Sequence, residues 1–355
     1  MTPPTPGEAL RRRAAASTFV LACLLLSQQP ALSQAPSPQA VCGNISKPAP
    51  DRIDACSSLL ERSQNPIERS LLLNNRCVAW QTLREWERSA TDCTEAIRLD
   101  PKNRRAYSNR CVSYYMRGDY DKALVDCSEA IARGGLEVAS SYINRGNIWF
   151  ARGAYDQALK DYDEAIHLNP KDVIAYGNRG RTWAAMKDFD RAIADFDASL
   201  GLRRQPNNLV SRGRVWRQKD KLELAIDDFT DAIRLDPRFA EAYFNRAVVF
   251  RMKNDLQGAL NDYSSAIQIN PDNPAYYNNR AWTYHLLERD ADGLSDAEKA
   301  LQIQPANASA LDTRGHIRAR LGQRELAIAD FREALALDPG NRSSIEGLKS
   351  LGVDP

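Results

Sequence analysis

The chain has few histidines and almost no excess of charge of either sign. Only three of its 355 residues are histidine, and 48 basic residues against 46 acidic ones leave a formal net charge of +2. A nearly neutral chain has no overall field to attract nucleic acid or an anionic membrane. The sequence also lacks a glycine-rich phosphate loop, a nucleophile elbow and a zincin motif. We therefore expect no nucleic-acid partner, no enzymatic activity, no cofactor and no metal.

Long apolar runs are missing beyond the N-terminus. Three consecutive arginines at 11–13 precede an apolar run over residues 14–26, and a small-x-small sequence follows at 31–33. This order is typical of a secretory signal peptide, and the run is too short to span a membrane. We expect residues 1–33 to be removed and the protein to be periplasmic or secreted. Alternatively, residues 20–23 resemble a lipobox, in which case Cys23 would carry a lipid anchor to the envelope.

A short phrase, Asn-Arg followed by a small residue, recurs along most of the chain, with serine or threonine for the asparagine in two copies. The eight arginines stand 33 to 35 residues apart, and an aspartate follows each of them after 16 residues. A period of this size is that of a two-helix unit. We number each unit from 1, which puts the arginine at position 7 and the aspartate at position 23. The expected units start near residues 70, 104, 139, 173, 206, 240, 274 and 308.

These units resemble the tetratricopeptide repeat over residues 70–341. Position 8 is small, position 11 is aromatic in seven units, position 20 is alanine in six, and position 24 is aromatic in five. Small side chains facing large ones allow two helices to pack closely. The resemblance implies an all-α fold, an α-solenoid in which stacked helical hairpins form a right-handed superhelix with the first helices along its concave surface.

The segments that flank the repeats are expected to differ from them. Residues 34–50 are rich in proline and serine and predict a linker. Residues 51–69 predict a helix that caps the first repeat, and residues 342–355 predict an amphipathic helix that caps the last one.

Six cysteines remain if Cys23 is lost with the signal peptide. An even number of cysteines in an exported protein favours disulfides. The resemblance makes positions 8 and 24 neighbours within a hairpin, and both are cysteine in the first two units. Buried free thiols are the alternative. The expected pairs are Cys42–Cys56, Cys77–Cys93 and Cys111–Cys127.

The residue at position 6, before each arginine, is the first candidate for ligand binding. In long superhelical members of the family, asparagines at this position line the inner surface and hold the backbone of an extended peptide. An amide side chain can both donate to and accept from a peptide group. The alternative is that each asparagine only bonds to a neighbouring turn. The candidates are Asn75, Asn109, Asn144, Asn178, Asn245 and Asn279.

Other positions expected to face the groove carry aromatic residues and arginines. Few acidic residues accompany these arginines, so an acidic segment or a terminal carboxylate is the expected ligand, unless the face is simply solvated. We predict a module that binds a peptide or partner segment in its concave groove. The alternative is a lipid-anchored scaffold or assembly factor that uses its convex face. The candidates are Tyr115, Phe150, Trp282, Arg181, Arg214, Arg217 and Arg251.

Overall fold

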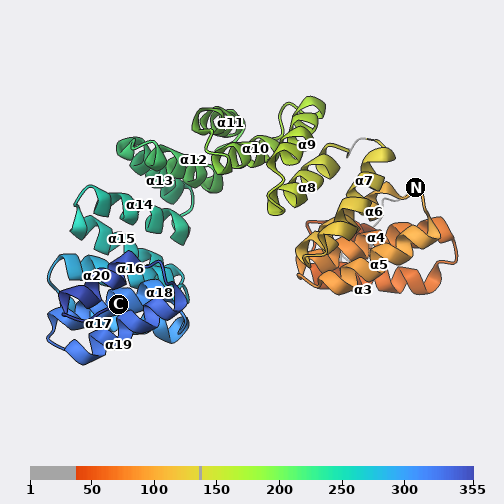
Figure 1. Ribbon diagram of the computed structural model, residues 1–355. Helices are drawn as coiled ribbons and strands as arrows, with labels where there is room; N and C mark the ends of the chain where they lie inside the picture. Colours follow the sequence, from red (N-terminus) through yellow and green to blue (C-terminus); the bar gives the residue numbers. More distant parts are fainter. Residues whose placement is uncertain (1–36, 136–137) are drawn as a thin grey trace, which may run out of the picture. The chain divides into compact units, whose positions relative to one another are not determined.

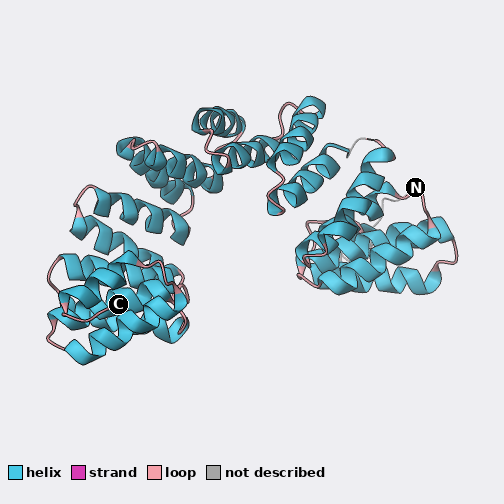
Figure 2. Cartoon of the chain, viewed as in Figure 1, coloured by secondary structure: helices cyan, strands magenta, loops and turns pink. Residues whose placement is uncertain are grey.

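The computed structural model describes residues 37–135 and 138–355, and within them all regular structure is helical (Figure 2). The described residues divide into two compact units, with the boundary between Ser113 and Tyr114; we treat the two separately and call them unit 1 and unit 2. The expected signal peptide and Cys23 lie outside the described residues. Among the described helices, none is both long and apolar enough to cross a bilayer.

Unit 1 contains more helix than the sequence predicts. The linker expected over residues 34–50 includes α2 (Pro38–Cys42), and α3 (Ala49–Arg62) begins within it (Figure 1). Proline is favourable at the first position of a helix, where no intrahelical N–H bond is lost, so the prolines here begin helices. The expected capping helix corresponds to α3, which ends at Arg62, and Asn65 then caps a new helix that begins at Pro66. The helices that complete unit 1 are α4 (Pro66–Thr82), α5 (Trp86–Leu99) and α6 (Arg104–Met116), which runs across the boundary between the units.

Unit 2 is a stack of helical hairpins. After α7 (Tyr120–Ala132), the first and second helices of six hairpins alternate, and α20 (Arg342–Ser350) follows the last hairpin and packs against both of its helices. The hairpins are α8 (Val138–Ala151) with α9 (Tyr155–Leu168), α10 (Val173–Ala185) with α11 (Phe189–Leu202), α12 (Pro206–Gln218) with α13 (Leu222–Leu235), α14 (Ala240–Met252) with α15 (Leu256–Ile269), α16 (Pro274–Leu286) with α17 (Asp290–Ile303), and α18 (Ala308–Arg320) with α19 (Arg324–Leu337).

In five of the six hairpins of unit 2, a small residue at position 8 faces an aromatic residue at position 24. A Cβ added to Gly146 would lie 2.6 Å from the ring of Tyr162, and Gly213 and Gly315 have the same relation to Phe229 and Phe331. Such a distance is far below van der Waals contact, so no larger side chain fits at position 8 of these hairpins. The aromatic side chains at position 24 are almost fully buried as a result.

The repeated arginines and aspartates join the two helices of a hairpin. Arg179, for example, donates from Nε and NH2 to both carboxylate oxygens of Asp195, at 2.8 and 2.7 Å. Its NH1 also donates to Asp163 in the preceding hairpin, at 2.7 Å. These pairs set the register between helices, and their guanidinium groups are not available to a ligand. The same bidentate pair occurs in Arg76–Asp92, Arg145–Asp161, Arg212–Asp228, Arg246–Asp262, Arg280–Asp296 and Arg314–Asp330.

The first helices of neighbouring hairpins also contact each other in unit 2. Contacts join α8 to α10, α10 to α12, α12 to α14, α14 to α16 and α16 to α18, whereas the second helices α9, α11, α13, α15, α17 and α19 have no such contacts with one another. The first helices therefore form one continuous surface, which we call the first-helix face. Residues at positions 5, 6, 9 and 12 lie on it or beside it.

Candidate functional site

A small pocket on the first-helix face surrounds Tyr162. Its volume is about 110 Å³, and it is lined by Tyr115, Asn147, Phe150, Tyr162, Asn178 and Arg181. Asn147 Oδ1 accepts hydrogen bonds from the Tyr162 hydroxyl and from Asn178 Nδ2, both at 2.8 Å. The Arg181 guanidinium lies 5.4 Å from the centre of the Phe150 ring. Burial raises the pKa of Tyr162, so its hydroxyl stays protonated and donates. We call this the Tyr162 pocket.

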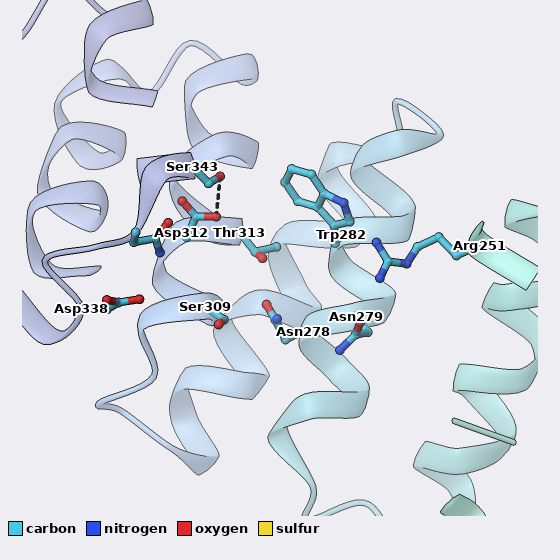
Figure 3. Close-up of a pocket in the computed structure, with 10 residues that line it drawn as sticks. Arg251, Asn278, Asn279, Trp282, Ser309, Asp312, Thr313, Asp338 and Ser343 are labelled. Carbon is cyan, nitrogen blue, oxygen red and sulfur yellow. Dashed lines mark hydrogen bonds between the residues drawn. The ribbon is translucent and has the colours of Figure 1, made fainter. Parts of the chain in front are cut away.

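A larger pocket of about 390 Å³ lies farther along the same face, between α14, α16, α18 and the start of α20. Figure 3 shows Arg251 extending from α14 toward Trp282 and Asn279 of α16. Two buried polar atoms here, Arg251 Nε and Asn278 Oδ1, have no hydrogen-bond partner in the described chain. One is a donor and the other an acceptor, so the pocket offers both to a ligand. We call this the Arg251 pocket; it is lined by Arg251, Asn278, Asn279, Trp282, Ser309, Asp312, Thr313, Asp338, Asn341 and Ser343.

Two residues that line the Arg251 pocket, Asp312 and Ser343, form a hydrogen-bonded cluster with His316. Ser343 Oγ donates to Asp312 at 2.9 Å (Figure 3). The same oxygen lies 2.9 Å from His316 Nε2. Because the hydroxyl proton goes to the carboxylate, His316 Nε2 must be the donor to Ser343. A catalytic triad needs the reverse, with the imidazole accepting the serine proton. This cluster joins α20 to α18 and is not arranged to activate a nucleophile.

The asparagines at position 6 do not form a uniform row of free amides. Asn109 Nδ2 donates to Asn74 at 2.8 Å, Asn178 donates to Asn147, and Asn245 is buried and donates to the Glu241 carbonyl at 2.7 Å. Asn279 Nδ2 donates to the Ala275 carbonyl at 2.9 Å, and Asn75 Nδ2 lies 3.9 Å from Cys42 Sγ. Only Asn144 has no side-chain hydrogen bond among the described residues. A peptide-binding role for these six residues stays a prediction.

The four candidate arginines differ in how their charges are compensated. Arg214 is paired with Glu241 and donates from Nε to Asn245 at 3.1 Å. Within the described ranges, Arg181, Arg217 and Arg251 have no carboxylate partner. Burial and the nearby Arg214 lower the pKa of Arg217, so its charge is held in an unfavourable environment. The positive charges of these three arginines are therefore not neutralised by a carboxylate of the described chain, and they could pair with an acidic ligand.

The aromatic candidates occupy both pockets. Tyr115 and Phe150 line the Tyr162 pocket, and Trp282 lines the Arg251 pocket. The Trp282 ring lies 5.1 Å from His285 and 5.6 Å from His316. His285 Nδ1 is 2.6 Å from Asp290, and the two histidine rings are 6.2 Å apart. No group of three possible metal ligands occurs among the described residues.

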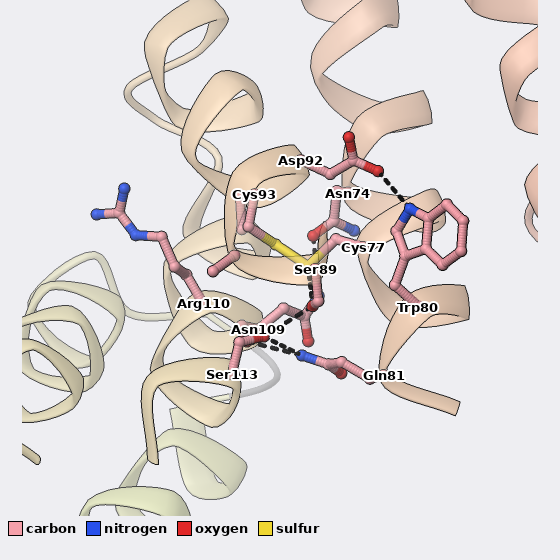
Figure 4. Close-up of a disulfide and its surroundings, with 12 residues drawn as sticks. Asn74, Cys77, Trp80, Gln81, Ser89, Asp92, Cys93, Asn109, Arg110 and Ser113 are labelled. Atoms are coloured by element: carbon pink, nitrogen blue, oxygen red, sulfur yellow. Dashed lines mark hydrogen bonds between the residues drawn. A yellow bond between two sulfur atoms is a disulfide. The ribbon is translucent and has the colours of Figure 1, made fainter. Parts of the chain in front are cut away.

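Two of the expected cysteine pairs are bonded in unit 1. Cys42 is joined to Cys56, and Cys77 to Cys93. Figure 4 shows the second disulfide between α4 and α5, where Cys77 Sγ lies 3.2 Å from Ser89 Oγ. Both sulfurs are fully buried and take the space that glycine and an aromatic ring fill in the hairpins of unit 2. Cys111 and Cys127 lie in different units, and their pairing stays a prediction.

The sequence analysis missed Asn147, Asn278 and Tyr263. Asn147 and Asn278 stand at positions 9 and 5, outside the repeated phrase. Tyr263 stands at position 24, where the pattern indicates only a packing role. A signal was nevertheless present, because position 24 is tyrosine in just two units, at 162 and 263, and phenylalanine in three. A hydroxyl inside a packed hairpin needs a partner.

Models of the tetratricopeptide repeat (TPR) match three segments of the chain. Two of them, residues 139–172 and 308–341, coincide with expected units, and a third model, described as a TPR repeat, matches residues 249–287. No curated protein sequence matches the chain.

Several solved structures have a similar fold. A chain of the APC/C hetero-tetramer Cut9–Hcn1 matches with a TM-score of 0.60 and 17% identity, over 89% of this chain and 61% of its own length. This chain therefore spans under two thirds of that protein. A TPR protein from Parabacteroides merdae matches with a TM-score of 0.55 and 20% identity, over 70% of this chain and 98% of its own. PilF of Pseudomonas aeruginosa matches with a TM-score of 0.55 and 17% identity, over 61% of this chain and 100% of its own length. At these identities the likeness concerns the fold alone.

The molecule is thus an all-α solenoid of stacked helical hairpins with polar pockets along its first-helix face. The repeat matches and the fold support the TPR family for this chain. Its repeats suggest a module for protein–protein interaction, and repeats of this kind generally build non-catalytic scaffolds.

Proposed function

We propose that the chain binds an extended peptide segment of another protein on the first-helix face of unit 2. The observation that carries this proposal is the pair of unsatisfied buried atoms in the Arg251 pocket, the donor Arg251 Nε and the acceptor Asn278 Oδ1. Leaving a buried polar group without a partner costs about 1–3 kcal/mol. A peptide backbone carries both an N–H and a C=O, so one peptide group can satisfy a donor and an acceptor together.

The side chains around these two atoms fit the same ligand. Asn279 uses Nδ2 within its own helix, and its Oδ1 accepts no hydrogen bond in the described chain, which leaves an acceptor on the pocket wall. Trp282 provides an aromatic surface in the same pocket, of the kind that anchors side chains at interfaces. The Tyr162 pocket, with Tyr115, Phe150 and Arg181, provides a second aromatic and cationic position along the face.

The experiment that tests this proposal uses pools of random peptides of about 12 residues, which in extended form span several hairpins. The full chain should bind such pools, and the double variant Asn278→Ala, Asn279→Ala should bind them more weakly by about tenfold or more, the equivalent of at least 1.4 kcal/mol. Asn261→Ala is the matched control, because Asn261 is exposed on α15, a second helix. Equal binding by the double variant and the wild type would contradict the proposal and favour the outer face.

We also propose that the chain is exported. The signal-peptide pattern of residues 1–33 supports this, and the disulfides of unit 1 are compatible with an oxidising compartment. Mass spectrometry of the mature N-terminus decides between the two processing routes. A start near residue 34 supports ordinary cleavage, whereas a lipidated Cys23 supports the alternative, an envelope-anchored scaffold. An intact N-terminus in the cytoplasm would contradict export.

A further inference from the structure

Arg181 and Arg214 occupy the same position of consecutive units but have different surroundings. Both stand at position 9 of a first helix, on α10 and α12. Arg214 is held by the next first helix, where it pairs with Glu241 and donates from Nε to Asn245 at 3.1 Å. Arg181 is exposed, and its guanidinium group makes no hydrogen bond or ion pair within the described ranges. The two arginines are therefore a matched pair, one with a compensated charge and one without.

The sequence explains why Arg181 lacks an internal partner. The two partners of Arg214 stand at positions 2 and 6 of the unit that follows it. After Arg181, the same two positions hold Asn207 and Ser211. Asparagine brings no negative charge to position 2, and serine has a shorter side chain than the asparagine at position 6. The change from a carboxylate to an amide thus leaves the positive charge of Arg181 without a partner in its own stack.

Arg181 lies instead over the preceding hairpin. Its guanidinium group is 5.4 Å from the centre of the Phe150 ring, and it lines the Tyr162 pocket together with Phe150 and Tyr115. A guanidinium group that rests on an aromatic face keeps its N–H groups available at the edge of its plane. The ring thus positions the charge at the pocket without neutralising it.

The other residues that line the Tyr162 pocket add a second donor and no acid. Asn147 Oδ1 accepts from the Tyr162 hydroxyl and from Asn178 Nδ2, both at 2.8 Å. The Nδ2 group of Asn147 has no acceptor in the described chain, so it is available to a ligand. None of the described residues that line the pocket carries a carboxylate. The pocket therefore offers one cation and one amide N–H donor, and its volume of about 110 Å³ fits one small side-chain group.

We propose that Arg181 and Asn147 bind the side-chain carboxylate of a glutamate or aspartate of the bound peptide in the Tyr162 pocket. This inference rests on the proposed function and names one side chain of its ligand. A carboxylate has two oxygens, so it can accept from the guanidinium group and from the amide at once. The rings of Tyr115 and Phe150 provide an apolar wall for the methylene groups that carry the carboxylate.

The test uses pools of peptides of about 12 residues with both termini blocked, so that side chains supply the only carboxylates. The random positions exclude Asp and Glu, and one central position is fixed as Glu or as its isostere Gln. The full chain should bind the Glu pool about tenfold or more tightly than the Gln pool, as expected for charge-assisted hydrogen bonds. Added salt should reduce this difference.

Three variants change the charge of the site in different ways. Arg181→Gln should abolish the preference for Glu. Asn207→Glu supplies the missing internal carboxylate in the first turn of α12, where an acidic residue is favourable, so Arg181 should form an ion pair like that of Arg214. The preference should then be lost although Arg181 itself is intact. Arg181→Glu should reverse it, so that a pool fixed as Lys binds more tightly than the Gln pool.

Two matched variants control for general effects. Asn261→Glu adds the same charge at an exposed asparagine of α15, a second helix, and Arg234→Gln removes an exposed arginine of α13 that is paired with Asp231. Both should keep the preference for Glu. Because Arg181 and Asn207 are exposed, their substitutions should preserve the fold, which circular dichroism and thermal unfolding check.

The outcomes separate this site from the proposed function. If the Glu and Gln pools bind equally, or if the preference survives Arg181→Gln and Asn207→Glu, the carboxylate site is wrong while peptide binding stands. If no pool binds, the proposed function fails, and N-acetylglutamate amide and its glutamine counterpart are titrated while the Arg181 Nε–H signal is followed by NMR. A shift caused by the glutamate compound alone supports the site, and equal shifts or none overturn it.

Discussion

The Tyr162 hydroxyl donates to Asn147 at 2.8 Å, and both side chains come from a single hairpin, α8 with α9. The equivalent pair in the hairpin of α14 and α15 is Tyr263 and Val248, which cannot form this bond. Two hairpins of the same construction thus bury a tyrosine at position 24. The Tyr162 hydroxyl has a side-chain acceptor in its own hairpin, whereas the Tyr263 hydroxyl has none there. The comparison makes the two tyrosines matched probes of what the hydroxyl contributes.

Replacing these tyrosines with phenylalanine should have opposite consequences for stability. Tyr162→Phe breaks a buried hydrogen bond and should lower the free energy of unfolding by about 1 kcal/mol. Tyr263→Phe removes an unsatisfied hydroxyl and should leave stability unchanged or raise it. Denaturant unfolding of both variants measures the difference. A loss of stability in Tyr263→Phe as large as in Tyr162→Phe would show that the Tyr263 hydroxyl has a structural partner.

The turn between the two helices of each hairpin contains a left-handed residue at position 15. Lys187 has a φ of 63°, whereas the equivalent Gly153 has a φ of 73° with open space beside its Cα. A residue with a Cβ is strained in this region by about 1 kcal/mol. We expect Lys187→Gly to stabilise unit 2 by about 0.5–1 kcal/mol and Gly153→Ala to destabilise it by a similar amount.

Gly201 is the control for the two turn variants. It lies inside α11 with a helical backbone and open space around its Cα, so Gly201→Ala should stabilise the helix by up to about 1 kcal/mol. Thermal melts of the three variants give the comparison. Destabilisation by Lys187→Gly would show that the lysine side chain, rather than the backbone, determines the stability of its turn.

The cysteines should resist alkylation until the protein is reduced. Intact mass after alkylation without reductant should show no label on the six cysteines beyond residue 37, and six labels after denaturation and reduction. Each bridge in unit 1 closes a short loop, with sequence separations of 14 and 16, so losing one should cost about 3 kcal/mol. Cys77→Ser with Cys93→Ser tests this directly. Labelling of Cys111 and Cys127 before reduction would contradict the third expected pair.

The stability of unit 2 should fall in mild acid partly because of His316. Burial lowers the pKa of this histidine, and the nearby Asp312 only partly opposes the effect. The pKa of His316 in the unfolded chain is about 6.5, and in the folded chain it is lower. Near pH 6.5 the unfolded chain therefore binds more protons than the folded chain. Stability must then decrease as the pH falls through that value, and the loss ends below the folded pKa.

Replacing His316 with asparagine isolates this contribution. An asparagine side chain is uncharged throughout, so the free energy of unfolding of His316→Asn should depend less on pH between about 7 and 5 than that of the wild type. His167, which is exposed at the end of α9, provides the matched control. Identical pH profiles for wild type and His316→Asn would show that His316 does not carry the effect.

The amino-acid sequence by itself determines the repeat, because its packing rules are local. A glycine at position 8 permits a ring at position 24 of the same hairpin, and an arginine at position 7 reaches an aspartate 16 residues later. Each of these relations lies within one unit and repeats with its period, so the helices, the hairpins and the Arg–Asp pairs are all readable from residue spacing. The N-terminal helices were less predictable, since proline both begins helices and occurs in linkers.

Only the tertiary structure decided which polar groups are compensated. Arg214 and Arg217 are three residues apart and look equivalent in the sequence, yet Arg214 reaches Glu241 on the next first helix, 27 residues away, and Arg217 reaches no carboxylate in the described chain. Asparagines that form a regular row in the sequence likewise differ in their hydrogen-bond partners. The compensation of a charge or a polar group depends on side chains from other hairpins, whose placement follows from how the repeats stack and not from the pattern within one repeat.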